Sequence, residues 1–197
     1  MNQDLEFDKI IMGIDPGTNV MGYGLLGIKG KNLTPLFLGA IELNKVGDHY
    51  LRLARIYERV TGIIDEFLPD ELAIEAPFYG KNVQSMLKLG RAQGVAMAAA
   101  LARDIPIAEY APLKVKQVVT GNGGASKEQV ANMLCYILKM QKEKLPSLLD
   151  ATDAMAVALT HHYESLRPST GNCAKNWEQF IKQHPERLSG TPSARKK

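Results

Sequence analysis

Four acidic residues stand directly beside apolar segments, where an uncompensated charge is costly. Asp15 ends the first apolar run of the chain, Glu75 ends a second one, and Asp150 and Asp153 begin the Ala-rich segment 150–159. A carboxylate is rarely found beside a core segment unless something compensates its charge. Because the four acids come from three distant parts of the chain, we expect a fold that gathers those parts around a shared counter-charge. Divalent cations are the simplest such counter-charge.

Apolar periodicity and turn residues predict three strands followed by helices and strands in alternation. Residues 9–15 are expected to form a strand that is buried on both faces, because their apolar residues are consecutive rather than alternating. A capping box, Ser126 to Gln129, marks the start of one helix. The expected strands are 9–15, 21–28, 33–43, 71–76 and 105–110. The expected helices are 48–67, 82–103, 126–139 and 150–166.

This order of elements predicts an α/β fold with a mixed five-stranded sheet and helices on its faces. The first three strands are expected to be antiparallel, with a hairpin turn at 30–32. In such a sheet the first and fourth strands can lie side by side, which would bring Asp15 and Glu75 to neighbouring strand ends. The arrangement resembles the ribonuclease H-like fold.

Charge and composition divide the chain into a body and a tail. Residues 1–166 are predicted to form one folded domain, and residues 167–197 a basic tail that is largely disordered. Residues 1–165 hold 17 Lys and Arg against 19 Asp and Glu, whereas residues 166–197 hold 7 against 2. The body therefore carries a net charge of −2 and the tail one of +5. Net charge does not make the body a nucleic-acid-binding domain, so such an interpretation has to rest on individual lysines.

The chain shows no sign of a membrane or secreted protein. No apolar run approaches the roughly 20 residues that a membrane-spanning helix needs. The acidic start of the chain lacks the basic and apolar regions of a signal peptide. Two cysteines are too few for a disulfide framework or a zinc site. We therefore expect a cytoplasmic protein without a membrane partner.

The four acids allow a structural and a chemical interpretation. Taken singly, Asp15 fits a turn, and Asp150 and Asp153 fit the N-terminus of a helix. Taken together, an i, i+3 pair on one helix face and two strand-end acids suit a pair of metal ions about 4 Å apart. Oxygen-only ligands favour Mg²⁺ or Mn²⁺ over Zn²⁺. The expected chemistry is hydrolysis of a phosphodiester, and no Gly-x-Ser-x-Gly nucleophile motif competes with it.

Two further groups of residues suit contact with a nucleic acid. Lys116, and Lys127 after the glycine-containing loop 121–126, are candidates for contacting a phosphate, although each also fits a solvated surface lysine. The loop after Glu75 carries Phe78, Tyr79 and Lys81. Its aromatic side chains are candidates for stacking on unpaired bases, with Lys81 on a phosphate. A hydrophobic staple onto the next helix explains the same aromatic residues equally well.

The residue patterns of two predicted helices indicate how these helices could pack. Helix 82–103 places small residues at Gly90, Gly94 and Ala98, a spacing that suits packing on the sheet or a two-fold helix–helix contact. Arg52 lies off the apolar stripe of helix 48–67. That stripe is expected to consist of Tyr50, Leu53, Tyr57, Val60, Ile64 and Phe67.

At these residues the chain closely resembles the RuvC family of Holliday-junction resolvases, from about Ile10 to His162. Five segments carry the resemblance: 11–18, 73–78, 88–94, 109–117 and 150–158. It implies a homodimeric, structure-selective DNA endonuclease of recombination and DNA repair. Such an enzyme nicks two opposed strands of a four-way junction and leaves 5′-phosphate and 3′-hydroxyl ends. The family works with the branch-migration complex RuvA–RuvB.

The resemblance also assigns roles to individual residues. It implies that Asp15, Glu75, Asp150 and Asp153 are the catalytic acids and hold two Mg²⁺ ions, for which Mn²⁺ can substitute. Phe78 corresponds to an aromatic residue that contacts the junction centre. Lys116 and Lys127 correspond to basic residues near the scissile phosphate. Nothing is carried over to the tail beyond about Arg167.

Three other functions share some of these features. The segment 13–18 also resembles the first phosphate loop of actin-like ATPases and sugar kinases, but those proteins need two such domains. A catalytically inert junction-binding module is disfavoured by the presence of all four acids. A general nuclease or a transposase-like domain on the same fold would cut linear duplex as well as a junction.

Overall fold

The structure, a computed structural model, describes residues 6–77, 82–141 and 149–167. Its contacts divide the chain into two units, Met1–Ser165 and Leu166–Lys197. Residues 168–197 lie outside the described part, so the domain boundary and the disordered tail stay predictions. The strands are β1 (Lys9–Asp15), β2 (Val20–Lys29), β3 (Asn32–Glu42), β4 (Glu71–Glu75) and β5 (Ile107–Tyr110). The helices are α1 (His49–Phe67), α2 (Val83–Leu101), α3 (Pro112–Thr120), α4 (Lys127–Ile137) and α5 (Leu149–Ser165).

The strands form one mixed sheet in the order β3-β2-β1-β4-β5. β1, β2 and β3 are antiparallel neighbours, whereas β4 runs parallel to both β1 and β5. A two-residue turn joins β2 to β3, and Gly30 there adopts a positive φ of 58° that suits glycine. The predicted five-stranded sheet, with its first and fourth strands side by side, is confirmed.

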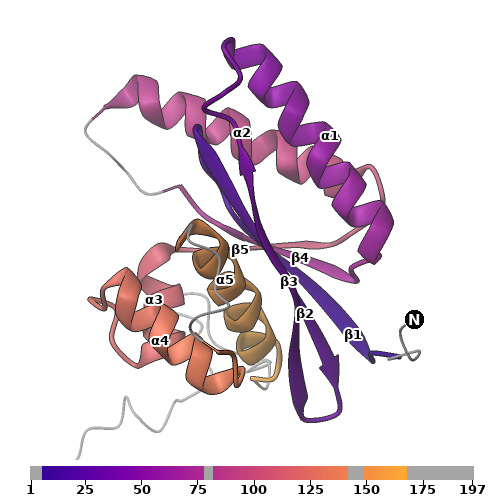
Figure 1. Cartoon of the computed structure of the whole chain (residues 1–197), viewed down its shortest axis with the longest axis vertical. Coiled ribbons are helices and arrows are strands. Elements are labelled where there is room, and N and C mark those ends of the chain that lie inside the picture. The colour runs from indigo at the N-terminus through magenta and orange to yellow at the C-terminus, as the bar shows by residue number, and fades with distance from the viewer. Residues whose placement is uncertain (1–5, 78–81, 142–148, 168–197) are drawn as a thin grey trace, which may run out of the picture. The chain divides into compact units, whose positions relative to one another are not determined.

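Helices cover both faces of the sheet, as Figure 1 shows for the first unit: α1 and α2 lie on one face and α3, α4 and α5 on the other. Each face has its own apolar core. The core beneath α1 and α2 contains Met12, Ile14 and Ile74, and the core beneath α3 to α5 contains Ile11 and Ala73. Coverage on both faces explains why the apolar residues of β1 are consecutive.

Helix α5 lies unusually close to the backbone of β1 and β2. A Cβ atom added to Gly13 would stand 2.0 Å from the carbonyl oxygen of Ala154, and one added to Gly22 would stand 1.9 Å from that of Asp150. Such distances are far below van der Waals contact. The glycines therefore let the helix backbone rest directly on the strands, and this contact places the N-terminus of α5 beside the end of β1.

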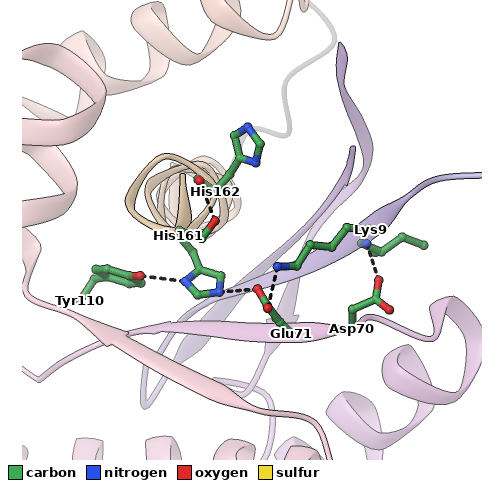
Figure 2. Close-up of polar contacts among 8 residues, drawn as sticks. Lys9, Asp70, Glu71, Tyr110, His161 and His162 are labelled. Carbon is green, nitrogen blue, oxygen red and sulfur yellow. Dashed lines mark hydrogen bonds and ion pairs between the residues drawn. The ribbon is translucent and has the colours of Figure 1, made fainter. Parts of the chain in front are cut away.

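A polar network fastens the second half of α5 to the sheet (Figure 2). His161 of α5 is bonded through Nδ1 to the Tyr110 hydroxyl at 2.7 Å and through Nε2 to Glu71 Oε2 at 2.7 Å. The ammonium group of Lys9 lies 2.6 Å from Glu71 Oε1. Partial burial acts to raise the pKa of Glu71, but the hydrogen bonds from Lys9 and His161 outweigh it and hold that pKa below its ordinary value. Glycine contacts and this network thus hold α5 along its length.

Two expectations about helices were wrong. No helix was expected over the segment that forms α3. This helix has only nine residues, starts at Pro112 and has no side-chain cap, so it lacks the usual start signal. The stripe expected on α1 was also misplaced in part, because Tyr50 and Tyr57 are exposed whereas Ile56 and Ile63 are buried.

We expect Gly13→Ala to destabilise the fold by about 1–3 kcal/mol or more, since the added methyl group displaces α5. The matched control is Gly62→Ala, where an added Cβ on α1 meets open space. That change should be neutral or stabilising by up to about 1 kcal/mol, because alanine favours helix. Urea unfolding of both variants measures the difference. Equal midpoints would show that the close approach of α5 does not constrain the fold.

Candidate active site

Strand alternation turns two acids toward the same side of the sheet. In β1, Ile11 belongs to the core beneath α3 to α5, and side chains two residues apart share a face, so Asp15 also points to that side. In β4, Ala73 belongs to the same core, which places Glu75 on that side as well. Because Ile14 pairs with Ile74 in the parallel register, Asp15 and Glu75 follow at neighbouring strand ends.

The N-terminus of α5 brings the other two acids to the same place. Asp15 pairs with Gly22 across β1 and β2, and the backbone of Asp150 rests on Gly22. Asp153 follows one turn later on the same helix face. Carboxylate oxygens of Asp15, Asp150 and Asp153 lie within 4.8 Å of one another. Three segments that are far apart in the sequence thus converge, as the position of the acids predicted.

A pocket of about 190 Å³ opens at this convergence. Its polar lining consists of acids and two lysines, and its apolar lining includes Val115 of α3 and Val130 of α4. Its lining comprises Asp15, Glu75, Pro112, Val115, Lys116, Lys127, Val130, Asp153 and Ala156. Glu75 therefore shares the pocket with Asp15 and Asp153, although it lies outside the tight group of three carboxylates.

Both predicted lysines line this pocket. The Lys127 ammonium lies 2.5 Å from Asp153 Oδ2 and 3.6 Å from Asp150 Oδ1. Lys127 is the first residue of α4, where a cation opposes the helix dipole. In this structure Asp150 and Asp153 act as its counter-charges, and contact of Lys127 with a phosphate stays a prediction. The charge of Lys116, from α3, opposes only part of the rise that burial and Asp153 cause in the pKa of Glu75.

The acids are held in an unfavourable electrostatic environment. Burial, together with the charges of Glu75 and Asp153, raises the pKa of Asp15 to about 8, although Lys127 acts in the opposite direction. Burial and the charge of Asp153 raise the pKa of Glu75 to about 7. The fold thus concentrates more negative charge than Lys116 and Lys127 neutralise, which is the expected condition of a site built for cations.

Some predicted residues cannot be placed, and others were not predicted. Phe78, Tyr79 and Lys81 lie outside the described residues, so their roles stay predictions. The apolar residues that line the pocket, among them Val115 and Val130, were not predicted from the sequence. Their signal was weak because Val115 belongs to the short helix α3, for which no element was expected.

A larger hollow of about 610 Å³ borders α4 but carries no acidic or basic side chain. Its lining comprises Thr120, Asn122, Ala125, Gln129, Asn132, Met133 and Tyr136. We assign it no chemistry, because the convergent charged groups lie in the smaller pocket.

Comparison with known proteins points to one family. The model of the family "Crossover junction endodeoxyribonuclease RuvC" matches residues 11–161. The RuvC protein of Porphyromonas gingivalis is 57% identical over 184 residues, which is 92% of this chain and 97% of that protein. The RuvC protein of Bacteroides fragilis is 59% identical over 181 residues, or 92% of this chain and 96% of that protein.

A solved structure agrees with these relatives. RuvC of T. thermophilus, in complex with a Holliday junction substrate, superimposes with a TM-score of 0.73 and 32% identity. The match covers 80% of this chain and 94% of that one. The expected ribonuclease H-like architecture is thereby confirmed.

The raised pKa values predict an unusual pH dependence of stability in the metal-free protein. Asp15 loses its proton near pH 4 when unfolded but near pH 8 when folded. Between these values only the unfolded state has lost the proton, so the free energy of unfolding falls as pH rises. We expect a decline on the order of a few kcal/mol, which Asp15→Asn should reduce but not abolish, because the raised pKa of Glu75 acts in the same direction.

Chemical denaturation of native protein and Asp15→Asn from pH 4 to pH 8, in the presence of a chelator, measures this dependence. A native stability that rises across the window, or an Asn variant with the same slope as the native protein, would contradict the account.

Proposed function

The chain belongs to the RuvC family of crossover junction endodeoxyribonucleases, and on this basis we propose that it resolves Holliday junctions in recombination and DNA repair. The observation that carries the proposal is the convergence of Asp15, Glu75, Asp150 and Asp153 in one place. Two strand ends and one helix N-terminus supply them, which is a rigid frame for chemistry on a phosphodiester.

The residues present fit divalent cations. Asp15, Asp150, Asp153 and Glu75 offer only carboxylate oxygens, the ligand type that Mg²⁺ and Mn²⁺ prefer. The raised pKa values of Asp15 and Glu75 indicate a site that lacks positive charge. We infer that these four acids hold two Mg²⁺ ions. When bound, the ions supply an activated water and stabilise the leaving 3′ oxygen, which leaves 5′-phosphate and 3′-hydroxyl ends.

The chain's own residues hold the substrate and balance its charge. Lys127 is half exposed at the mouth of the pocket and covers Asp153, whose side chain is only 14% exposed. We propose that Lys127 exchanges this carboxylate for a DNA phosphate when cations neutralise the acids. Lys116 lines the same pocket as Glu75 and is proposed to contact the same stretch of DNA backbone.

The loop after Glu75 is proposed to recognise the branch point. It leaves the active site directly, because β4 ends at Glu75 and α2 begins at Val83. We propose that Phe78 and Tyr79 stack on bases at the junction centre and that Lys81 contacts a phosphate. Unstacked bases at a branch point would distinguish a junction from linear duplex.

Symmetric nicking of two opposed strands requires two active sites, and we propose a homodimer. The face of α2 that carries Gly90, Gly94 and Ala98 is exposed rather than packed on the sheet. Val83, Leu87 and Leu101 on this helix are at least half exposed. A two-fold contact along this face would bury these apolar side chains.

The cellular location and the partner complex follow from the proposed DNA substrate. We propose that the protein acts in the cytoplasm, where the chromosome of a bacterium lies, and works with the branch-migration complex RuvA–RuvB. Within the described residues, no helix is long and apolar enough to span a membrane. The family match over residues 11–161 favours this function over an ATPase half-domain, because it includes the segment 13–18 that suggested the ATPase.

We expect Asp150→Asn to lower junction cleavage by at least about a hundredfold while junction binding is largely retained. The change removes one charge from the metal site, whereas binding rests on lysines and on junction shape. Asp65→Asn, the same change at an exposed residue of α1 that pairs with Arg103, is the control and should cut normally. Single-turnover cleavage and gel-shift titration on a synthetic four-way junction measure both properties. Native-like cleavage by Asp150→Asn would refute the assignment of the acids.

A further inference from the structure

A second polar pocket, of about 280 Å³, lies beyond the turn that follows Asp15. Its walls come from this turn, from the start of α1 and from the start of α2. The lining residues are Thr18, Asn19, Gly47, His49, Arg52, Ser85 and Lys88. Three of these side chains can carry positive charge, and no acidic side chain is among them. None of the sequence motifs or the proposed metal site accounts for this pocket.

Hydrogen bonds to uncharged acceptors hold the side chain of Arg52 in place. Its Nε atom donates to the carbonyl oxygen of Val46 at 2.7 Å, and its Nη1 atom donates to Thr18 O at 3.0 Å and to Asn19 Oδ1 at 2.9 Å. No carboxylate forms an ion pair with Arg52 in the described ranges. The guanidinium is therefore both fixed in orientation and uncompensated in charge, a preorganised site for an anion.

Other donors surround this fixed charge. Lys88 on α2 is exposed and pairs with no carboxylate among the residues that the structure places. The Nε2 atom of His49 is shielded from water and has no hydrogen-bond partner there. Ser85 adds a hydroxyl group from the first turn of α2. The nearby carboxylate of Asp48 is already engaged, since it caps α1 by accepting from two backbone N–H groups.

The position of the pocket indicates which anion it takes. Thr18 is three residues from Asp15, so their Cα atoms are at most about 11 Å apart. One strand of duplex DNA places a phosphate every ~3.4 Å along the axis, so a strand that runs from the metal site toward Thr18 reaches the pocket within about three nucleotides. A phosphate accepts from several donors at once and suits a planar guanidinium beside a lysine.

We propose that this pocket binds a backbone phosphate of the DNA strand, within a few nucleotides of the scissile one. The inference rests on the proposed nuclease function and adds a contact on the side of Asp15 that faces away from Lys116 and Lys127. With one phosphate in this pocket and another beside Lys127, the strand is held at two points around the acids. Such contacts fix register without reading sequence.

Lys88→Gln tests the proposal, because Lys88 forms no ion pair with the described residues that its loss would break. The control is Lys29→Gln, which removes the same charge from an exposed residue at the opposite end of β2. Lys88→Arg retains the charge. The measurement is junction affinity against salt concentration, with cleavage-dead Asp150→Asn as the common background, together with cleavage rates in the native background.

We expect Lys88→Gln to weaken junction binding roughly five- to tenfold and to lower the slope of log K against log salt by about 0.9, equally for junctions of different sequence. Lys29→Gln and Lys88→Arg should retain the parent slope. If Lys88→Gln matches Lys29→Gln while the parent protein binds and the native protein cuts the junction, the pocket proposal is wrong. If the parent does not bind and the native protein does not cut the junction, the proposed function itself fails.

Discussion

The contact between the backbone of α5 and the glycines of β1 and β2 sets the geometry of the whole site. With any side chain at Gly13 or Gly22, the helix would have to move away from the sheet. Asp150 and Asp153 would move with it, because both belong to the first turns of α5. The bonds of His161 to Tyr110 and Glu71 hold the other half of the helix. Packing at the strand backbone therefore decides the spacing of the acids.

That packing forces like charges together, and the cost is visible in the raised pKa values of Asp15 and Glu75. Lys127 relieves part of the repulsion through its contacts with Asp153 and Asp150. Lys116 and Lys127 together cannot balance four carboxylates, so the site retains a strong preference for added positive charge. Bound divalent cations would supply that positive charge and would in turn attract a DNA phosphate. The rigid placement of the acids is thereby linked to catalysis.

The sequence predicted the positions of the strand-end acids and of Lys127 because the signals for them were local. Asp15 and Glu75 end apolar runs, and the capping box placed Lys127 at a helix start, as the structure has them. Side-chain contacts between distant segments were not predictable in this way. The hydrogen bonds of Arg52 to Val46, Thr18 and Asn19 depend on the start of α1 lying against the turn between β1 and β2, so the sequence showed only an arginine off the apolar stripe. Helix α3 was missed because a short helix without a capping side chain has few recognisable signals in the sequence.

The most direct test of the central claim is to map the strand breaks that the protein makes in a mobile four-way junction with and without Mg²⁺. The account predicts two symmetric nicks in opposed strands, with 5′-phosphate ends, that appear only when Mg²⁺ or Mn²⁺ is present. Cleavage that persists in a chelator, or equal cleavage of linear duplex of the same sequence, would contradict it.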